Sequence, residues 1–162
     1  MKLKNIQEKG IISIDDNLTF HRIIDVLNDL FNKGYKGTGR GTFPFGNDGK
    51  YLWFPKLNET NKKYKPNPAK YGHVIAACWS NILSFDGTTI TQKWIATDYL
   101  PPWGPIDKTK KEKIVDIGVF AKEIRGDYKF VGIFHYDPAN SHDYTTIYKR
   151  YSKELPFIEW RK

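Results

Sequence analysis

Six short segments rich in β-branched and aromatic residues follow one another between Tyr51 and Tyr151, and they constrain the fold more than any other feature of the chain. Gly, Pro, Asn and Asp bound the segments, as they bound strands that are joined by turns. In order, the segments are YLWF, HVIAACWSNIL, TTITQKWIA, IVDIGVFAKEI, YKFVGIFHY and YTTIYKRY. This pattern disfavours alternating βαβ units. It predicts a strongly curved sheet or a small β-barrel.

One strong helical pattern precedes these segments. From Leu18 to Asn32, apolar residues recur at helical spacing, after the capping candidates Asp15, Asp16 and Asn17. We therefore expect a mixed α/β, mostly β fold with one main N-terminal helix. The expected parts of a single domain over 1–162 are a lead (1–16), a helix (17–33), a basic glycine-rich loop (34–50) and a β core (51–151).

The composition indicates a basic protein that is rich in aromatic rings. Lys and Arg number 26 against 18 Asp and Glu, which leaves a net charge of +8, and 15% of the residues are aromatic. An acidic partner such as nucleic acid is the leading expectation, and some rings can stack on a ligand. A polar N-terminus and the lack of a long apolar run predict a cytoplasmic protein without a membrane partner.

Cysteine and histidine usage bounds the chemistry. The single cysteine, Cys78, excludes an intramolecular disulfide and any multi-cysteine zinc site. The four histidines are scattered and form no metal-binding or nuclease motif. We therefore expect no metal, no cofactor and no catalytic residues in this chain.

A hairpin between Cys78 and Trp94 is the most informative segment. Asp86-Gly87 between two strand-like runs predicts a two-residue turn, in which the numbers of paired residues add up to 173. This register places Trp79 opposite Trp94, Asn81 opposite Gln92, and Leu83 opposite Ile90 on one mostly apolar face.

The amide pair on that face needs partners. Burying an amide without hydrogen bonds costs roughly 1–3 kcal/mol. Asn81 and Gln92 must therefore bond each other across the strands, reach backbone or water, or face a ligand. Amides beside indole rings suit a planar heterocycle, which stacks on its face and bonds along its edge.

Four segments resemble, in order and spacing, a known module. They are YLWFPKL at 51–57, W-x-N-x-L-S-x-D-G-x-T-I-T at 79–91, YKFVGIF at 128–134 and IYKRY at 147–151. They are similar to the SRA-like domain, of the PUA superfamily, in modification-dependent restriction endonucleases that act on DNA containing 5-hydroxymethylcytosine or its glucosylated form. The resemblance covers about 34–151.

The resemblance implies a DNA reader. The fold would be PUA-like or SRA-like, and a modified cytosine (5-methyl, 5-hydroxymethyl or glucosylated) would be flipped out of double-stranded DNA into a pocket. Trp79 and Asn81 match the family's base-recognition residues. Gln92 stands where the family has an acidic residue, and a carboxamide can both donate and accept hydrogen bonds. Further candidates for the wall of the base pocket are Trp94, Tyr51 and Trp53.

The resemblance also implies that DNA binding and DNA cleavage belong to separate domains. In the family the reader is joined to a separate nuclease domain, so we expect this chain to bind DNA while another domain or chain cuts it, in restriction of modified phage DNA. Arg40 and Phe43 are expected to approach DNA from the glycine-rich loop. The lysines expected near phosphates are Lys36, Lys62, Lys63, Lys110 and Lys111.

Three alternatives stay open. Rings, amides and positive charge would equally serve an RNA-binding PUA-like module. A protein-interaction domain would use all the aromatic residues in its core. A cryptic nuclease could use Asp116 with Glu123 and Arg125, and cleavage of modified DNA with Mg²⁺ would reveal it.

Overall fold

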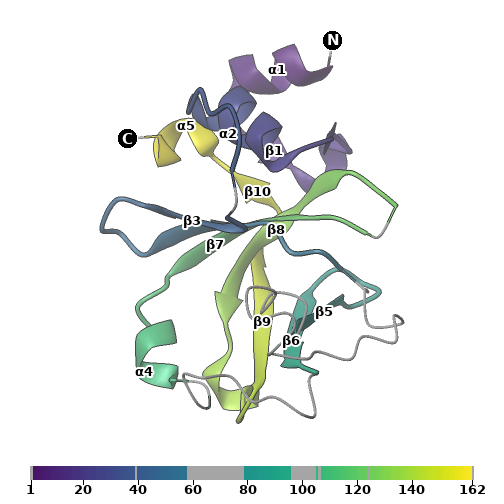
Figure 1. Cartoon of the computed structure of the whole chain (residues 1–162). Helices are drawn as coiled ribbons and strands as arrows, with labels where there is room; N and C mark the ends of the chain where they lie inside the picture. Colours follow the sequence, from purple (N-terminus) through teal and green to yellow (C-terminus); the bar gives the residue numbers. More distant parts are fainter. Residues whose placement is uncertain are drawn as a thin grey trace.

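Most of the helices gather at one end of the molecule, a curved sheet extends away from them, and the short helix over Lys108–Lys111 lies near the far end of the sheet (Figure 1). The structure is a computed structural model that describes residues 2–38, 40–57, 79–95, 105, 107–123 and 125–161. The α-helices are α1 (Lys2–Lys9), α2 (Ile23–Phe31), α4 (Lys108–Lys111) and α5 (Phe157–Trp160), with 3-10 turns η1 (Ile14–Asp16) and η4 (Pro138–Asn140). The strands are β1 (Ile12–Ser13), β2 (Thr19–Phe20), β3 (Thr42–Phe45), β4 (Lys50–Trp53), β5 (Trp79–Leu83), β6 (Thr89–Trp94), β7 (Asp116–Ala121), β8 (Tyr128–Tyr136), β9 (Thr145–Ser152) and β10 (Glu154–Leu155).

The main sheet has the strand order β3-β4-β7-β8-β9-β6-β5, and β2 adds a short pairing with β8. Neighbouring strands are antiparallel except β4 and β7, which run parallel. The mostly β, mixed α/β class is confirmed, and each of the six strand-like segments overlaps one of the strands β4 to β9. Among the described residues the sheet is curved and does not close, which confirms the curved-sheet form of the prediction.

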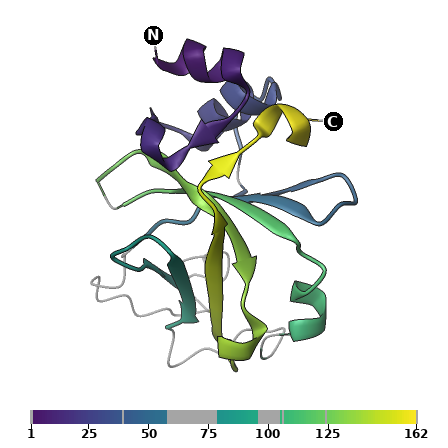
Figure 2. The same cartoon turned by 180° about the vertical axis from the view of Figure 1, so that it is seen from behind.

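Irregular pairing in β8 accompanies the curvature. The pairing of β8 with β7 shifts register between Val119 and Phe120, and its pairing with β9 shifts between Ile133 and Phe134. Bulges of this kind bend a strand and increase its twist. Gly132 lies between the two shifts with a φ of 129°, a conformation that favours glycine. The bend turns the far part of the sheet away from the helices, as both views show (Figures 1 and 2).

The two faces of the sheet bury separate cores. On one face, Leu52, Phe120 and Phe130 pack in a cluster with Leu27 of α2 and Phe157 of α5. The opposite face, which we call the inner face, carries the second cluster: Leu57, Ile90, Ile117, Val119, Ala121, Phe134 and Tyr148, with Trp53, Leu83 and Tyr136 packed against it. The inner face also bears the predicted aromatic and amide residues.

The N-terminal expectation needs correction. The expected lead contains helix α1, and the main helix begins at Ile23 instead of residue 17. Tertiary pairing decides this, because Thr19 and Phe20 pair with β8. The capping candidates serve another purpose: Asp16 Oδ2 accepts a hydrogen bond from the Ser13 amide at 2.7 Å in η1, and Asn17 takes a left-handed φ of 52°.

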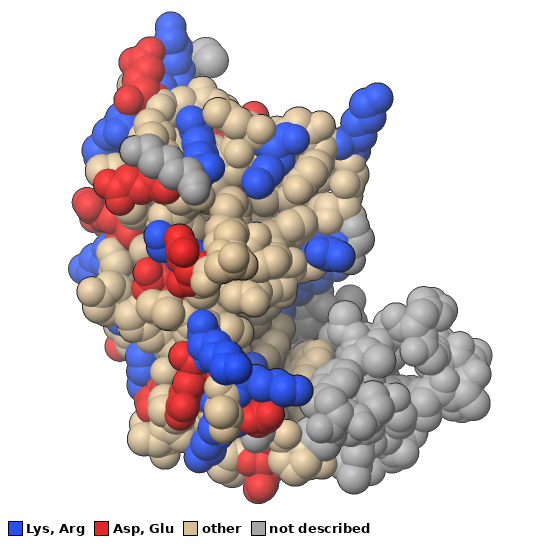
Figure 3. Space-filling view, turned by 90° about the vertical axis from the view of Figure 1, so that its left-hand side faces the viewer, with Lys and Arg blue, Asp and Glu red and all other residues tan. Residues whose placement is uncertain are grey.

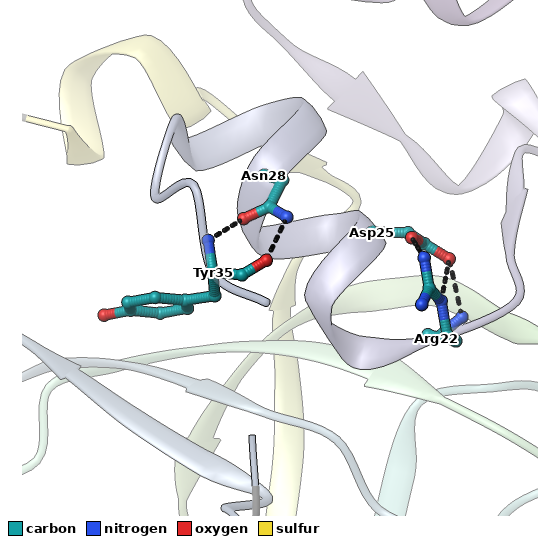
Figure 4. A network of polar contacts seen from close by, with 4 residues as sticks. All are labelled: Arg22, Asp25, Asn28 and Tyr35. Atoms are coloured by element: carbon teal, nitrogen blue, oxygen red, sulfur yellow. Dashed lines mark hydrogen bonds and ion pairs between the residues drawn. The ribbon is translucent and has the colours of Figure 1, made fainter. Parts of the chain in front are cut away.

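The glycine-rich segment is more ordered than a basic loop. Asn28 of α2 holds the chain after the helix: its Nδ2 donates to the Tyr35 carbonyl at 2.8 Å, and its Oδ1 accepts from the Tyr35 amide at 2.7 Å (Figure 4). Further along, β3 lies within the expected loop and pairs with β4, where Phe43 lies opposite Leu52. The expected boundary at residue 50 therefore falls inside a hairpin.

Candidate nucleic-acid interface

The β5–β6 hairpin has the predicted register. Trp79 pairs with Trp94, Asn81 with Gln92, and Leu83 with Ile90. The turn itself is longer than predicted, because Ser84 and Thr89 are the last residues joined across the hairpin and Phe85–Thr88 form the loop. The observed four-residue loop is centred on the same two residues, Asp86 and Gly87, as the predicted two-residue loop. The same residues are therefore paired, and the same residues share a face.

The end of the hairpin that is distant from the turn brings the two tryptophans together. Their ring centroids lie 5.0 Å apart with planes at 87°, which is an edge-to-face contact. Trp94 is buried and Trp79 is half-buried. The structure therefore places the two indoles together on the inner face, in the row next to the amide pair.

The Asn81 side chain carries the most informative atom of the site. Its Oδ1 is buried and has no hydrogen-bond partner among the residues that the structure describes. Gln92 therefore does not donate to it, and the alternative in which the two amides satisfy each other through this oxygen is wrong. Buried polar groups of native proteins are nearly always paired, and each exception calls for an explanation. This acceptor is left for water or for a ligand.

Neighbouring strands extend the amide pair with tyrosines. On β9, Thr146 pairs with Gln92, and Tyr148 is the diagonal neighbour of Gln92, at a typical spacing of about 7–8 Å. Tyr148 in turn pairs with Tyr136 of β8. Curvature brings Trp53 of β4 onto the same cluster, with its ring centroid 5.2 Å from that of Tyr148.

A cation and a second buried oxygen complete this part of the inner face. Lys111 Nζ, from α4, donates to the Tyr148 hydroxyl at 3.0 Å and lies 6.0 Å from the centroid of the Tyr136 ring. Within the described residues no hydrogen bond of good geometry reaches the buried Tyr136 hydroxyl, and burial raises the pKa of this phenol above its usual 10.0, against a smaller lowering by the nearby Ser141 hydroxyl. Tyr136 therefore stays protonated at neutral pH and can donate a hydrogen bond.

The turn of the hairpin is held by Asp86. Its Oδ1 accepts hydrogen bonds from Ser84 Oγ at 2.7 Å, Thr88 Oγ1 at 2.7 Å and the Thr88 amide at 3.1 Å. The bonds from Ser84 and Thr88 lower the pKa of Asp86 from 3.8 to about 2.

Because this pKa is lowered in the folded state, the carboxylate's contribution to stability is fully present above pH 3.8. It is lost as the pH falls from there through about 2. We expect the chemical shift of the Thr88 amide to titrate with a midpoint near pH 2 in NMR spectra. A midpoint near 4 would contradict the role of the turn bonds.

The other predicted wall and backbone residues are more dispersed. Tyr51 is half-buried beside Ile117 on the inner face. Lys36 and Arg40 are exposed and precede β3, at the opposite edge of the sheet from β5. Phe43 packs toward the helix-covered core, 5.8 Å from Phe54. The structure thus does not bring Phe43 to the amide pair.

The structure describes only one of the two predicted lysine clusters, the one that contains Lys110 and Lys111. Lys62 and Lys63 lie outside the described residues. Lys110 is exposed and free to approach a phosphate. Lys111 is half-buried, and its ammonium group already donates a hydrogen bond to the Tyr148 hydroxyl. On the side of the molecule that carries β3 and α4, Lys and Arg lie among Asp and Glu and form no continuous basic patch (Figure 3).

The residues of the cryptic-nuclease alternative do not meet. Asp116 opens β7 and bonds His135 Nε2 at 2.7 Å, while Glu123 follows the far end of the same strand, roughly 23 Å away along an extended chain. Among the described residues, no group of three or more His, Cys, Asp or Glu is arranged to hold a metal ion. No helix in the described part of the chain is long and apolar enough to span a membrane.

Sequence reasoning missed Tyr136, Tyr148 and the contact of Lys111 with them. Both tyrosines lie in segments that were expected to be strands. Their placement beside Gln92 depends on the pairing of β8 with β9, whose register shifts at Ile133/Phe134. The only signal in the sequence was the glycine within YKFVGIF, which is compatible with a bulge.

Comparison with known proteins decides the family. The family model of the SET and RING associated (SRA) domain matches residues 5–157. The chain belongs to the SRA family. SRA domains are DNA-reader modules, and membership of the family supports binding of modified cytosine in DNA at the level of the family.

A solved structure is similar to the SRA domain in fold. It is the 5-hydroxymethylcytosine-specific restriction enzyme AbaSI, which is 24% identical with a TM-score of 0.60. The match covers 94% of the present chain and 44% of that enzyme chain, so the SRA domain spans less than half of the enzyme's length. No curated protein matches the chain.

Proposed function

We propose that this SRA domain, as one unit over residues 1–162, binds double-stranded DNA that contains a modified cytosine and holds the extruded base on the inner face. Trp79 stacks on the base, and Asn81 with Gln92 bonds its polar edge. The observation that carries the proposal is the buried Oδ1 of Asn81, an acceptor that no described residue of the chain satisfies and that lies beside an indole and a second amide. Cutting is the task of another domain or chain.

The chemistry of the three side chains suits cytosine. The exocyclic amine of cytosine is a donor, and Asn81 Oδ1 is an acceptor that needs one. Gln92 can supply both a donor and an acceptor to the rest of the edge, where a carboxylate could only accept. Extrusion of a base costs a few kcal/mol, which stacking at about 1–3 kcal/mol and these hydrogen bonds offset.

A binding panel tests the proposal. Identical duplexes carry one cytosine, 5-methylcytosine, 5-hydroxymethylcytosine or glucosylated 5-hydroxymethylcytosine, and fluorescence anisotropy at fixed salt measures the dissociation constants. We expect at least one modified duplex to bind about tenfold or more tightly than the unmodified one. Single-stranded RNA as competitor should displace the duplex poorly.

Variants of Trp79 test whether the preference measured in the binding panel depends on the proposed site. Trp79→Ala should bring the four dissociation constants together, because it removes the stacking surface, whereas Trp79→Phe should keep the order of preference. Asn47→Ala, in the exposed β3–β4 turn, is the control and should change nothing. Equal affinity across the panel for the unaltered protein, or tighter binding of RNA, would refute the proposal.

A further inference from the structure

The tip of the β5–β6 hairpin presents a fully exposed phenylalanine. Phe85 has 109% of its reference surface exposed, more than any other large apolar side chain among the described residues. It lies four residues from Asn81 on the same strand and its extension, which is roughly 13 Å along an extended chain. The amide pair and Phe85 therefore belong to one hairpin, with the amides on its inner face and the ring at its end.

The turn that carries Phe85 is stiff. Besides the three hydrogen bonds to Asp86, Ser84 Oγ accepts from the amides of Thr88 at 3.2 Å and Thr89 at 3.0 Å. The Gly87 amide donates to the Ser84 carbonyl at 2.9 Å, and Gly87 takes a φ of 75° that favours glycine. The ring is thus held in water on a backbone with little freedom to turn it inward.

Two cations of β9 flank the tip. Arg150 N donates to the Thr88 carbonyl at 2.8 Å, and Lys149 Nζ donates to Thr89 Oγ1 at 3.0 Å. Consecutive strand residues point to opposite faces, so the two side chains lie on either side of the hairpin. The Arg150 guanidinium reaches Gly87 so closely that a Cβ there would lie 3.1 Å from Nη1.

Arg150 is a half-buried cation without an acceptor. Within the described part of the chain, its guanidinium takes part in no ion pair or hydrogen bond to a side chain or carbonyl. It borders an open pocket of about 440 Å³ that Gly87 and Leu83 also line, and the pocket rim carries Lys129 with Glu123 and Asp127. In the turn next to Arg150, Asp86 Oδ1 already accepts hydrogen bonds from Ser84 and Thr88.

We propose that Phe85 is a wedge that enters the base stack of the bound duplex beside the extruded nucleotide, while Arg150 and Lys149 contact the flanking phosphates. This inference rests on the proposed function. Proteins that kink DNA insert apolar side chains between base steps, and they offset the cost of unstacking with additional contacts. A stiff turn suits this role because the ring does not have to be ordered on binding, and the cations favour a polyanion over an apolar protein surface.

A duplex with an abasic site tests whether Phe85 acts as a wedge or only contacts the DNA surface. Two duplexes carry the same preferred modified cytosine, one opposite guanine and one opposite an abasic site, where base pairing has already been lost. We expect Phe85→Ala to weaken binding of the paired duplex about tenfold and of the abasic duplex less than threefold. Phe85→Leu should retain most of the affinity. Ile82→Ala, a half-exposed apolar residue of the same hairpin, is the matched control and should change neither.

The outcomes distinguish this inference from the proposed function. If the unaltered protein binds neither duplex with preference for the modified base, the proposed function fails and the wedge fails with it. If it binds with preference but Phe85→Ala binds both duplexes as well as the unaltered protein, or loses affinity for both equally, only the wedge is overturned. Unchanged thermal unfolding of Phe85→Ala shows that the variant is folded.

The phosphate contact has its own readout. Each phosphate neutralised on duplex DNA contributes about 0.9 to the slope of log affinity against log salt concentration. Arg150→Met keeps the stem that packs on Gly132 and should lower the slope by about that amount while the order of preference in the panel stays the same. An unchanged slope would contradict the contact of Arg150 with phosphate.

Discussion

Replacing Asn81 with leucine is expected to stabilise the free domain and to remove most of its preference for modified DNA. The buried Oδ1 has no partner in the described part of the chain, and leaving a buried polar group unsatisfied costs about 1–3 kcal/mol. Leucine has a similar volume and fits the apolar row of Leu83 and Ile90 beside it. We expect the free energy of unfolding in urea to rise by about 1 kcal/mol.

The same substitution should lower the affinity for the preferred modified duplex by roughly ten- to a hundredfold, because a well-made contact to a base edge contributes about 1–3 kcal/mol. Opposite signs of the two effects are typical of a residue that is kept for binding and not for folding. Lower stability with unchanged affinity would instead assign the amide to the structure of the domain.

Ser141→Ala is the matched control for this prediction. Ser141 is also a buried polar residue, but its Oγ donates to the Asp137 carbonyl at 2.7 Å and accepts from the Ile147 amide at 2.8 Å. Its removal leaves both groups without their partner, so we expect a loss of about 1–3 kcal/mol of stability. The order of affinities across the modified duplexes should remain unchanged.

Gly132→Ala is expected to be the most destabilising of the single substitutions considered. Gly132 has a φ of 129°, and a Cβ there would lie 2.6 Å from Arg150 Cδ and 2.9 Å from the Ser152 carbonyl oxygen. The arginine stem can move, but the carbonyl belongs to the neighbouring strand and cannot. We expect a loss of about 2–4 kcal/mol, from backbone strain and displaced pairing.

Thermal unfolding followed by circular dichroism measures this effect, with an expected fall in Tm of roughly 5–15 °C. Gly37→Ala is the control: nothing lies within 4 Å of the Cβ it would add, and its φ is not in the left-handed region. Its Tm should stay within about 2 °C of the unaltered protein. If Gly132→Ala were equally harmless, the bulge would not be what bends β8.

The hairpin register could be derived from the sequence because it depends on local features. Asp86-Gly87 marks the centre of the turn, and the period of two along a strand then assigns Trp79, Asn81, Gln92 and Trp94 to one face. The assignment survives the longer turn because lengthening a loop by one residue on each side preserves the pairing. The length of that loop depends on the hydrogen bonds to Asp86 Oδ1. Residue propensities for turns do not predict these bonds.

The N-terminal third shows where local reasoning fails. The helical spacing after Leu18 is real, but Thr19 and Phe20 gain strand pairing with β8, more than 100 residues away in the chain, and the helix begins later. Likewise β3 is rich in Phe and forms because β4 lies beside it, which a glycine-rich composition conceals. Long-range pairing overrides propensity in both places.

The sequence by itself determined the strand segments, the face shared by two indoles and two amides, and the family to which those residues point. Only the tertiary structure decided three further features: within the described residues Asn81 Oδ1 lacks a partner, Tyr136, Tyr148 and Lys111 lie on the same inner face, and the Arg150 guanidinium lies against Gly87 in the turn that carries Phe85. The reason is physical: strand periodicity acts over neighbouring residues, whereas burial and contact between strands depend on the bulges at Gly132 and on the curvature they produce.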